Sequence, residues 1–119
     1  MKIVRASEYT GARAWEAMPI TAIDNATVRL HWTDQPYQWH VNDGDEVFAV
    51  LDGEVAMHYR EDGRELVAHL RAGDIFHAAG GDAHCAHPVG QARILVIERR
   101  QRLTRRWRWR FPVAVGQPV

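Results

Sequence analysis

The 119-residue chain is predicted to form an all-β domain, a sandwich or a small barrel, on three observations. Short extended segments, either alternating or wholly apolar, recur at intervals of about ten residues from residue 27 onward. Turn signals built from Gly and Asp separate these segments, and the chain contains no linker, low-complexity stretch or coiled-coil heptad. The composition, 46% hydrophobic and 25% charged, fits one globular domain over residues 1–119 and is too apolar for a disordered chain.

Several other classes of protein are excluded by the sequence. No run approaches the roughly 18 apolar residues of a transmembrane span, so no membrane partner is expected. The first residues lack the apolar core of a secretory signal, which makes the cytoplasm the expected location. The one cysteine, Cys85, excludes an internal disulfide and a multi-cysteine zinc site, and a buried, inert thiol is expected there.

The first predicted elements lead into the barrel. A short helical turn is expected over residues 12–18, because Ala, Arg, Glu and Met favour helix and Pro19 follows them. Thr27–Trp32 alternates polar and apolar residues and is predicted as a strand with one buried face. Glu46–Leu51 is apolar on both parities, which is typical of a strand covered on both faces.

A hairpin is predicted directly after this covered strand. Asp52-Gly53 is a strong signal for a two-residue hairpin turn, so residues 54–60 are expected to return as the partner strand. A second turn of the same kind at residues 61–64 leads into a strand over residues 65–70. Three further extended segments complete the prediction: residues 75–78, 83–87 and 91–98.

Side chains with the chemistry of metal ligands gather around the covered strand. His40 and Asn42 lie two residues apart, so on a strand both point to one face. Glu46 begins the next strand after a turn-like cluster, and His84 follows the Gly80-Gly81 turn on a later strand. In a barrel these side chains can converge into a mixed nitrogen and oxygen site, which suits Fe, Mn, Ni, Cu, Co or Zn.

Two motifs in this region resemble the signature motifs of the cupins, small β-barrels of the jelly-roll type, and the resemblance covers residues 27–98. The first motif runs His40, Val41, Asn42, three residues, Glu46, six residues, Gly53. The second runs Gly73, five residues, Ala79-Gly80-Gly81, two residues, His84, three residues, Pro88. The 19 residues between them resemble the spacing in single-domain microbial cupins. The resemblance implies a cupin double-stranded β-helix (jelly-roll) barrel of the small, phosphomannose-isomerase-like type.

Four positions depart from the cupin pattern. Three of them lie outside the ligand positions: Asp34 for Gly, Ala79 for Pro and Pro88 for Asn. The fourth, Asn42, stands where the pattern has its second metal-binding histidine. A neutral amide oxygen is a weaker ligand than imidazole for borderline transition metals. This substitution therefore bears on metal affinity and occupancy.

The resemblance implies a site for one divalent transition metal, with these ligands: His40, Glu46, His84 and, as the candidate fourth, Asn42. Phe48 shares the parity of Glu46 and is expected to line the pocket. His77, on the strand before His84, is expected to line the pocket or to substitute as a ligand. The other histidines are interpreted as surface or satisfied core residues: His31, His58, His69 and His87.

The motifs leave the function open between two classes. The first is a metal-dependent enzyme acting on a small polar metabolite, in which the metal is a Lewis acid or, if it is iron, binds dioxygen. The second is a non-catalytic module that binds or senses a small molecule, because one fold hosts many chemistries. A redox-active metal with an open position favours the enzyme, and a metal-free barrel with a co-purified ligand favours the module.

The formal net charge of zero conceals two opposite parts. Residues 1–98 hold 15 acidic residues against 8 basic ones, a charge of −7, whereas residues 99–119 hold seven arginines and no acid. Basic residues with interleaved tryptophans are a signal for an anionic partner such as nucleic acid. However, the apolar residues of this segment share one parity, which favours an amphipathic strand that pairs with its own barrel or with a partner subunit: Leu103, Trp107, Trp109 and Phe111. A homodimer is expected from the resemblance and because sheet edges need cover.

Overall fold

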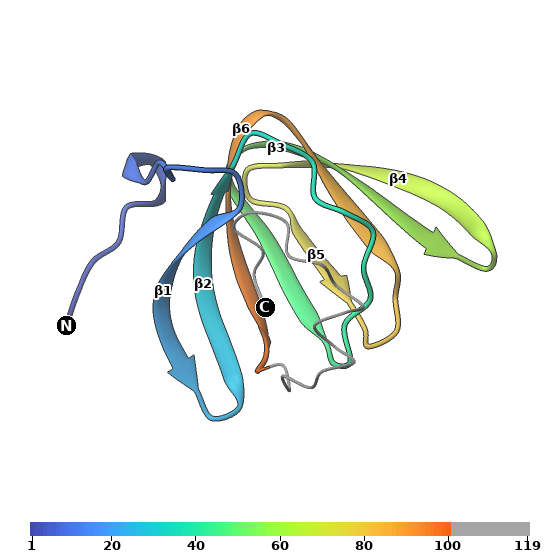
Figure 1. The fold of residues 1–119 in the computed structure, drawn as a ribbon, viewed down its shortest axis with the longest axis horizontal. Helices are drawn as coiled ribbons and strands as arrows, with labels where there is room; N and C mark the ends of the chain where they lie inside the picture. Colours follow the sequence, from blue (N-terminus) through green and yellow to red (C-terminus); the bar gives the residue numbers. More distant parts are fainter. Residues whose placement is uncertain (101–119) are drawn as a thin grey trace.

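The computed structural model describes residues 1–100, which form six β-strands and a single 3-10 turn (Figure 1). The 3-10 turn, η1, spans Ala6–Glu8. The strands are β1 (Glu16–Ile23), β2 (Ala26–Thr33), β3 (Glu46–Glu61), β4 (Arg64–Arg71), β5 (Ile75–Ala78) and β6 (His84–Arg99). The strand predicted around Trp107 and Trp109 lies outside the described residues.

The strands join in one antiparallel sheet with the order β1-β2-β6-β3-β4, and β5 pairs with the first part of β3. Strands β3 and β6 have 16 residues each and pair along most of their length. Their register runs from Glu46↔Glu98 at one end to Tyr59↔His84 at the other. In Figure 1 the β1–β2 hairpin lies on one side of this central pair, and β4 extends with the second half of β3 on the other side. The predicted all-β fold is confirmed.

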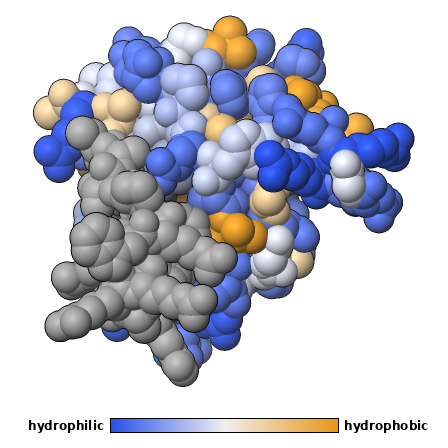
Figure 2. All heavy atoms as spheres, turned by 45° about the vertical axis from the view of Figure 1, so that its right-hand side comes forward, coloured by the Kyte–Doolittle hydropathy of each residue, from blue (hydrophilic) through white to orange (hydrophobic). Residues whose placement is uncertain are grey.

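The core lies on the inner faces of the two long strands. Phe48 and Val50 on β3 are buried and stand opposite Val96 and Ile94 on β6. Buried and less buried residues alternate along both strands, which is the pattern of a sheet with one covered face. The outer surface in Figure 2 is mostly hydrophilic, with apolar side chains scattered over it.

The hairpin predicted at Asp52-Gly53 is wrong, because β3 continues through these residues as one strand. The register with β6 shifts on both sides of Asp52, which marks a β-bulge. Gly53 has a φ of +84°, a conformation that bends the strand without reversing it. The predicted strands 46–51 and 54–60 are therefore two halves of β3, and β6 likewise unites the predicted segments 83–87 and 91–98.

The helical turn predicted over residues 12–18 is also wrong. Strand β1 begins at Glu16, which pairs with Trp32, so pairing with β2 overrides the local helix preference. Pro19 is tolerated because β1 forms the edge of the described sheet and its register shifts between Pro19 and Thr21. No helix within residues 1–100 is long and apolar enough to cross a membrane.

Replacing Gly53 with alanine is expected to destabilise the protein by at least about 2 kcal/mol, because the new Cβ would run into the carbonyl oxygen of Gln91 and a positive φ disfavours alanine. Gly63→Ala is the matched control, since Gly63 also has a positive φ but no atom lies within 4 Å of the place that a Cβ would take there. This control should lose only about 1 kcal/mol. Urea denaturation measures both losses. Equal losses would show that the contact with Gln91 contributes nothing.

Candidate metal centre

His40, Glu46 and His84 converge inside the barrel. Glu46 opens β3 and His84 opens β6, while His40 is tied to His84 by a two-residue β-bridge with both backbone hydrogen bonds at 3.1 Å. One ligand atom from each residue lies within 4.8 Å of the other two. The side chains of Glu46 and His84 are buried, and that of His40 is 14% exposed. The structure thus brings together the three strongest ligands expected from the sequence.

Backbone carbonyl groups orient both imidazole rings. Nδ1 of His40 lies 3.2 Å from the carbonyl oxygen of Gln38, and Nδ1 of His84 lies 2.9 Å from that of Asp82. Because a carbonyl oxygen only accepts hydrogen bonds, these contacts place a proton on Nδ1 of each ring. Nε2 of His84 then faces Oε1 of Glu46 at 2.9 Å, and Nε2 of His40 faces it at 3.9 Å. Two Nε2 atoms and a carboxylate therefore point at one small volume.

The electrostatics of the centre favour a cation there. Burial raises the pKa of Glu46, but the adjoining imidazoles of His40 and His84 outweigh it and lower the pKa to about 2. Burial lowers the pKa of His84, but the hydrogen bond and negative charge of Glu46 outweigh it and leave the pKa raised. The negative charge of Glu46 thus stabilises a positive charge at this position, and a bound metal ion would supply one.

Asn42 is buried beside these three residues, but it contacts Glu46 through its amide nitrogen. Nδ2 donates a hydrogen bond to Oε1 of Glu46 at 2.6 Å, which holds the carboxylate in place. Ligation by Asn42 would require its amide oxygen to face the ion instead. The fourth ligand therefore stays a prediction, and the observed contact is that of a positioning residue.

An enclosed pocket adjoins the centre and has room for about one water molecule, with a volume of about 20 Å³. Its walls include Trp15, Tyr37, Phe48 and Val96, so most of its surface is apolar or aromatic. Tyr37 packs edge-on against the ring of His40, with centroids 4.9 Å apart, and Trp15 packs edge-on against Tyr37. The walls shield the centre from water and support the His40 ring.

His77 lies outside this pocket. It is paired with Val47, whereas Ala78 and Phe76 pair with Glu46 and Phe48, so His77 faces the opposite side of the sheet. Its side chain is 57% exposed, and Nε2 contacts Oδ2 of Asp45 at 3.1 Å. The expectation that His77 lines the pocket is therefore wrong, because the register of β5 against β3 gives the inward position to Phe76.

Glu98 was not among the residues singled out from the sequence, yet it lines the pocket opposite Glu46. The residue is 6% exposed, and burial together with the charge of Glu46 raises its pKa to about 8. Near neutral pH this carboxyl group therefore keeps its proton. The available signal was parity, because Glu98 continues the inward series of Ile94 and Val96 on a strand that reads as wholly apolar.

His31 is a second buried group of this interior. Nδ1 lies 3.2 Å from the carbonyl oxygen of Trp15, whereas Nε2 has no hydrogen-bond partner among the described residues. Burial lowers the pKa of His31 to about 4, so the ring is neutral at physiological pH. The sequence predicted a core histidine with its hydrogen bonds made, and within residues 1–100 this holds for Nδ1 but not for Nε2.

Cys85 and two further histidines occupy the other face of the β3–β6 pair. Cys85 is buried, its Sγ donates to the carbonyl oxygen of Tyr37 at 3.2 Å, and burial raises the pKa of the thiol. The rings of His58 and His87 lie with their centroids 4.1 Å apart and their planes tilted by 42°. Burial and the raised pKa are in keeping with an unreactive thiol.

Comparison with known proteins places this geometry in a fold family. No family model matches the sequence, and no curated protein matches it. Among the similar solved structures, three match 76–83% of this chain and 84–90% of their own chains. The first is a cupin-2 domain protein from Shewanella frigidimarina, with 24% identity and a TM-score of 0.66. The second is a cupin superfamily protein from Desulfitobacterium hafniense, with 17% identity and a TM-score of 0.64. The third is a double-stranded β-helix domain protein from Klebsiella pneumoniae, with 22% identity and a TM-score of 0.66. The chain is therefore a small protein with the cupin fold, the double-stranded β-helix.

Proposed function

We propose that the chain binds one divalent transition metal ion through His40, Glu46 and His84 and uses it to bind and activate a small polar metabolite. The observation that carries the proposal is the convergence of two Nε2 atoms and one carboxylate within 4.8 Å. Two imidazoles and a carboxylate suit borderline ions such as Fe, Mn, Co, Ni, Cu and Zn, and they leave coordination positions open. The residues present thus fit the ion.

The bound ion would supply a Lewis acid that polarises a carbonyl or hydroxyl oxygen. The residues of the chain supply the rest of the site. The carbonyl groups of Gln38 and Asp82 keep both Nε2 atoms free of protons once a cation is present, and Asn42 holds Glu46 in position. The carboxyl group of Glu98 lines the same pocket, where it can form a hydrogen bond with a ligand oxygen.

The pocket also limits the ligand. Its present volume, about 20 Å³, takes little more than one water molecule, so a metabolite enters only if an aromatic wall moves. Among the aromatic residues that line the pocket, Trp15 has an unusual backbone conformation, since its φ of +63° lies in the left-handed region.

The small volume and the positions of the ion and Glu98 define the ligand class that fits. It is a small molecule with one or two oxygen atoms able to face the ion and Glu98.

A non-catalytic binding module is the second candidate, and Asn42 favours it. As placed, its amide nitrogen contacts Glu46, so one strong ligand fewer surrounds the ion than in the pattern the motifs resemble. A weakly held ion or none would then leave the pocket for a small molecule alone. Mass spectrometry of the native protein separates the two candidates, because the module should retain a metabolite after the metal is removed.

We expect Co²⁺ titration to give one equivalent of bound metal with a visible ligand-field spectrum, and His84→Ala to lose it, because this change removes one of two imidazole ligands. His77→Ala is the matched control, since His77 faces outward and touches Asp45. It should bind as the wild type does. Stoichiometric Co²⁺ in His84→Ala, confirmed by elemental analysis, would refute the site.

A further inference from the structure

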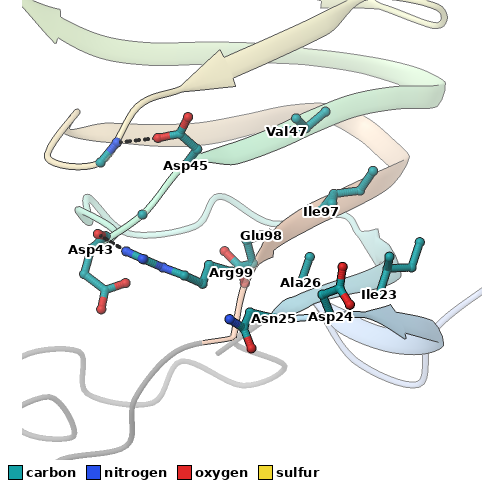
Figure 3. A pocket seen from close by; sticks show the side chains of 12 residues that line it. Ile23, Asp24, Asn25, Ala26, Asp43, Asp45, Val47, Ile97, Glu98 and Arg99 are labelled. Atoms are coloured by element: carbon teal, nitrogen blue, oxygen red, sulfur yellow. Dashed lines mark hydrogen bonds between the residues drawn. The ribbon is translucent and has the colours of Figure 1, made fainter.

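A second, open cleft lies at the end of the barrel where the β1–β2 turn, the entry to β3 and the end of β6 meet (Figure 3). Its volume is about 570 Å³, within the range of clefts that bind a ligand. Three exposed acidic residues lie on its rim: Asp24, Asp43 and Asp45. Its apolar lining includes Ile23, which is 62% exposed. An acidic rim around an exposed apolar surface suits a partner that is both basic and apolar.

The first arginine of the basic C-terminal run is already seated in this cleft. Nη2 of Arg99 donates to the carbonyl oxygen of Asp43 at 2.7 Å, as Figure 3 shows. The guanidinium packs on Gly44, where any Cβ would come within 2.8 Å of Nε. A Cβ at residue 44 would therefore force the guanidinium of Arg99 to shift from this position.

The chain also leaves the described residues at the cleft itself. The backbone N–H of Arg100 donates to the carbonyl oxygen of Asn25, on the β1–β2 turn, at 2.6 Å. The residues that follow carry five more arginines and no acid, with Leu103, Trp107, Trp109 and Phe111 on one parity. The acidic rim is thus complementary in charge, and the apolar lining in hydropathy, to the segment that begins beside it.

We propose that this cleft is the docking surface for residues 101–111 of the same chain. The arginines of the segment neutralise the acidic rim, and its apolar residues cover Ile23, Val47 and Ile97. The net charges of −7 and +7 on the two parts of the chain then balance within one molecule. Glu98 lines both this cleft and the metal pocket, so the docked segment covers the outer side of the pocket wall.

The test is trypsin cleavage of the full-length protein within residues 102–110, followed by intact mass. The double variant Asp24→Asn with Asp43→Lys weakens the acidic rim but leaves the backbone carbonyl that binds Arg99. The matched control is Asp62→Asn with Glu61→Lys at the β3–β4 turn, where Asp62 has the same φ of +52° as Asp24. We expect the cleft variant to be cut about tenfold faster than the wild type and the control to be cut at the wild-type rate, because cleavage follows the undocked population.

A second measurement uses the wild type alone. Raising the salt from about 10 mM to about 1 M shortens the Debye length from roughly 30 Å to 3 Å and should speed cleavage of the segment relative to a free arginine peptide. Equal cleavage of the cleft variant and the wild type, with no salt effect, would overturn the proposal. Protection that grows with protein concentration would also overturn it, because the segment would then dock on a second copy.

Discussion

Glu46→Gln is expected to weaken divalent-metal binding by at least about 100-fold while leaving the protein folded. Glutamine keeps the size of the side chain but removes the only anionic ligand of the group of three. The expected loss follows from charge, because a neutral amide cannot balance a divalent ion in a pocket that excludes water. Competition with a chromophoric chelator measures the affinity, and urea denaturation reports folding.

The matched control for this change is Glu98→Gln, in the register position opposite Glu46 on β6. Both residues are buried glutamates of the same pocket, but Glu98 keeps its proton at neutral pH and lies outside the ligand group. Glu98→Gln should therefore bind metal within a few-fold of the wild type. Tight binding in Glu46→Gln, or equal losses in both variants, would contradict the assignment of Glu46 as the charged ligand.

Two members of the ligand group could be predicted from the sequence because they lie at strand starts. Glu46 opens β3 and His84 opens β6, and each follows a turn that the sequence marks with Gly and Asp, so small errors in strand length do not move them. His40 lies outside the strands, and its spacing from Glu46 in the motif identified it. Asn42 illustrates the limit of the motif, since spacing alone places it beside the candidate metal centre but only the structure shows that its amide nitrogen contacts Glu46.

The errors share one physical origin, the pairing between strands, which a local sequence signal does not contain. Asp-Gly is the same local signal for a reversing turn and for a glycine bulge, and only the pairing of both halves of β3 with β6 distinguishes them. Strand register also decides which parity faces inward. The register of β5 against β3 turns His77 away from the pocket, and that of β6 against β3 places Glu98 in it.

Lowering the pH from 7 to 4 is expected to cost about 3 kcal/mol of folding stability through His31 alone. The ordinary pKa of 6.5 applies to the unfolded chain, whereas burial lowers the pKa in the folded protein to about 4. Between these values the unfolded chain binds more protons than the folded protein, so stability is full above pH 6.5 and falls as the pH drops. Desolvation is a sound cause here, because the residue is 0% exposed and Nε2 finds no partner within residues 1–100.

His31→Gln isolates this effect, because glutamine keeps a hydrogen-bond donor in the core but does not titrate. At pH 7 the variant should be less stable than the wild type, since its side chain fills the site less well and the contact with Trp15 is weakened. The gap should narrow by about 3 kcal/mol at pH 4, where the wild type loses the contribution of its neutral imidazole. Urea denaturation with a chelator present gives both curves, and His69→Gln, at an exposed position, controls for the loss of a histidine as such. A stability difference between the two proteins that stays constant from pH 7 to pH 4 would contradict this prediction. It would show that His31 accepts a proton in the folded protein as easily as in the unfolded chain, and hence that Nε2 has a partner or access to water.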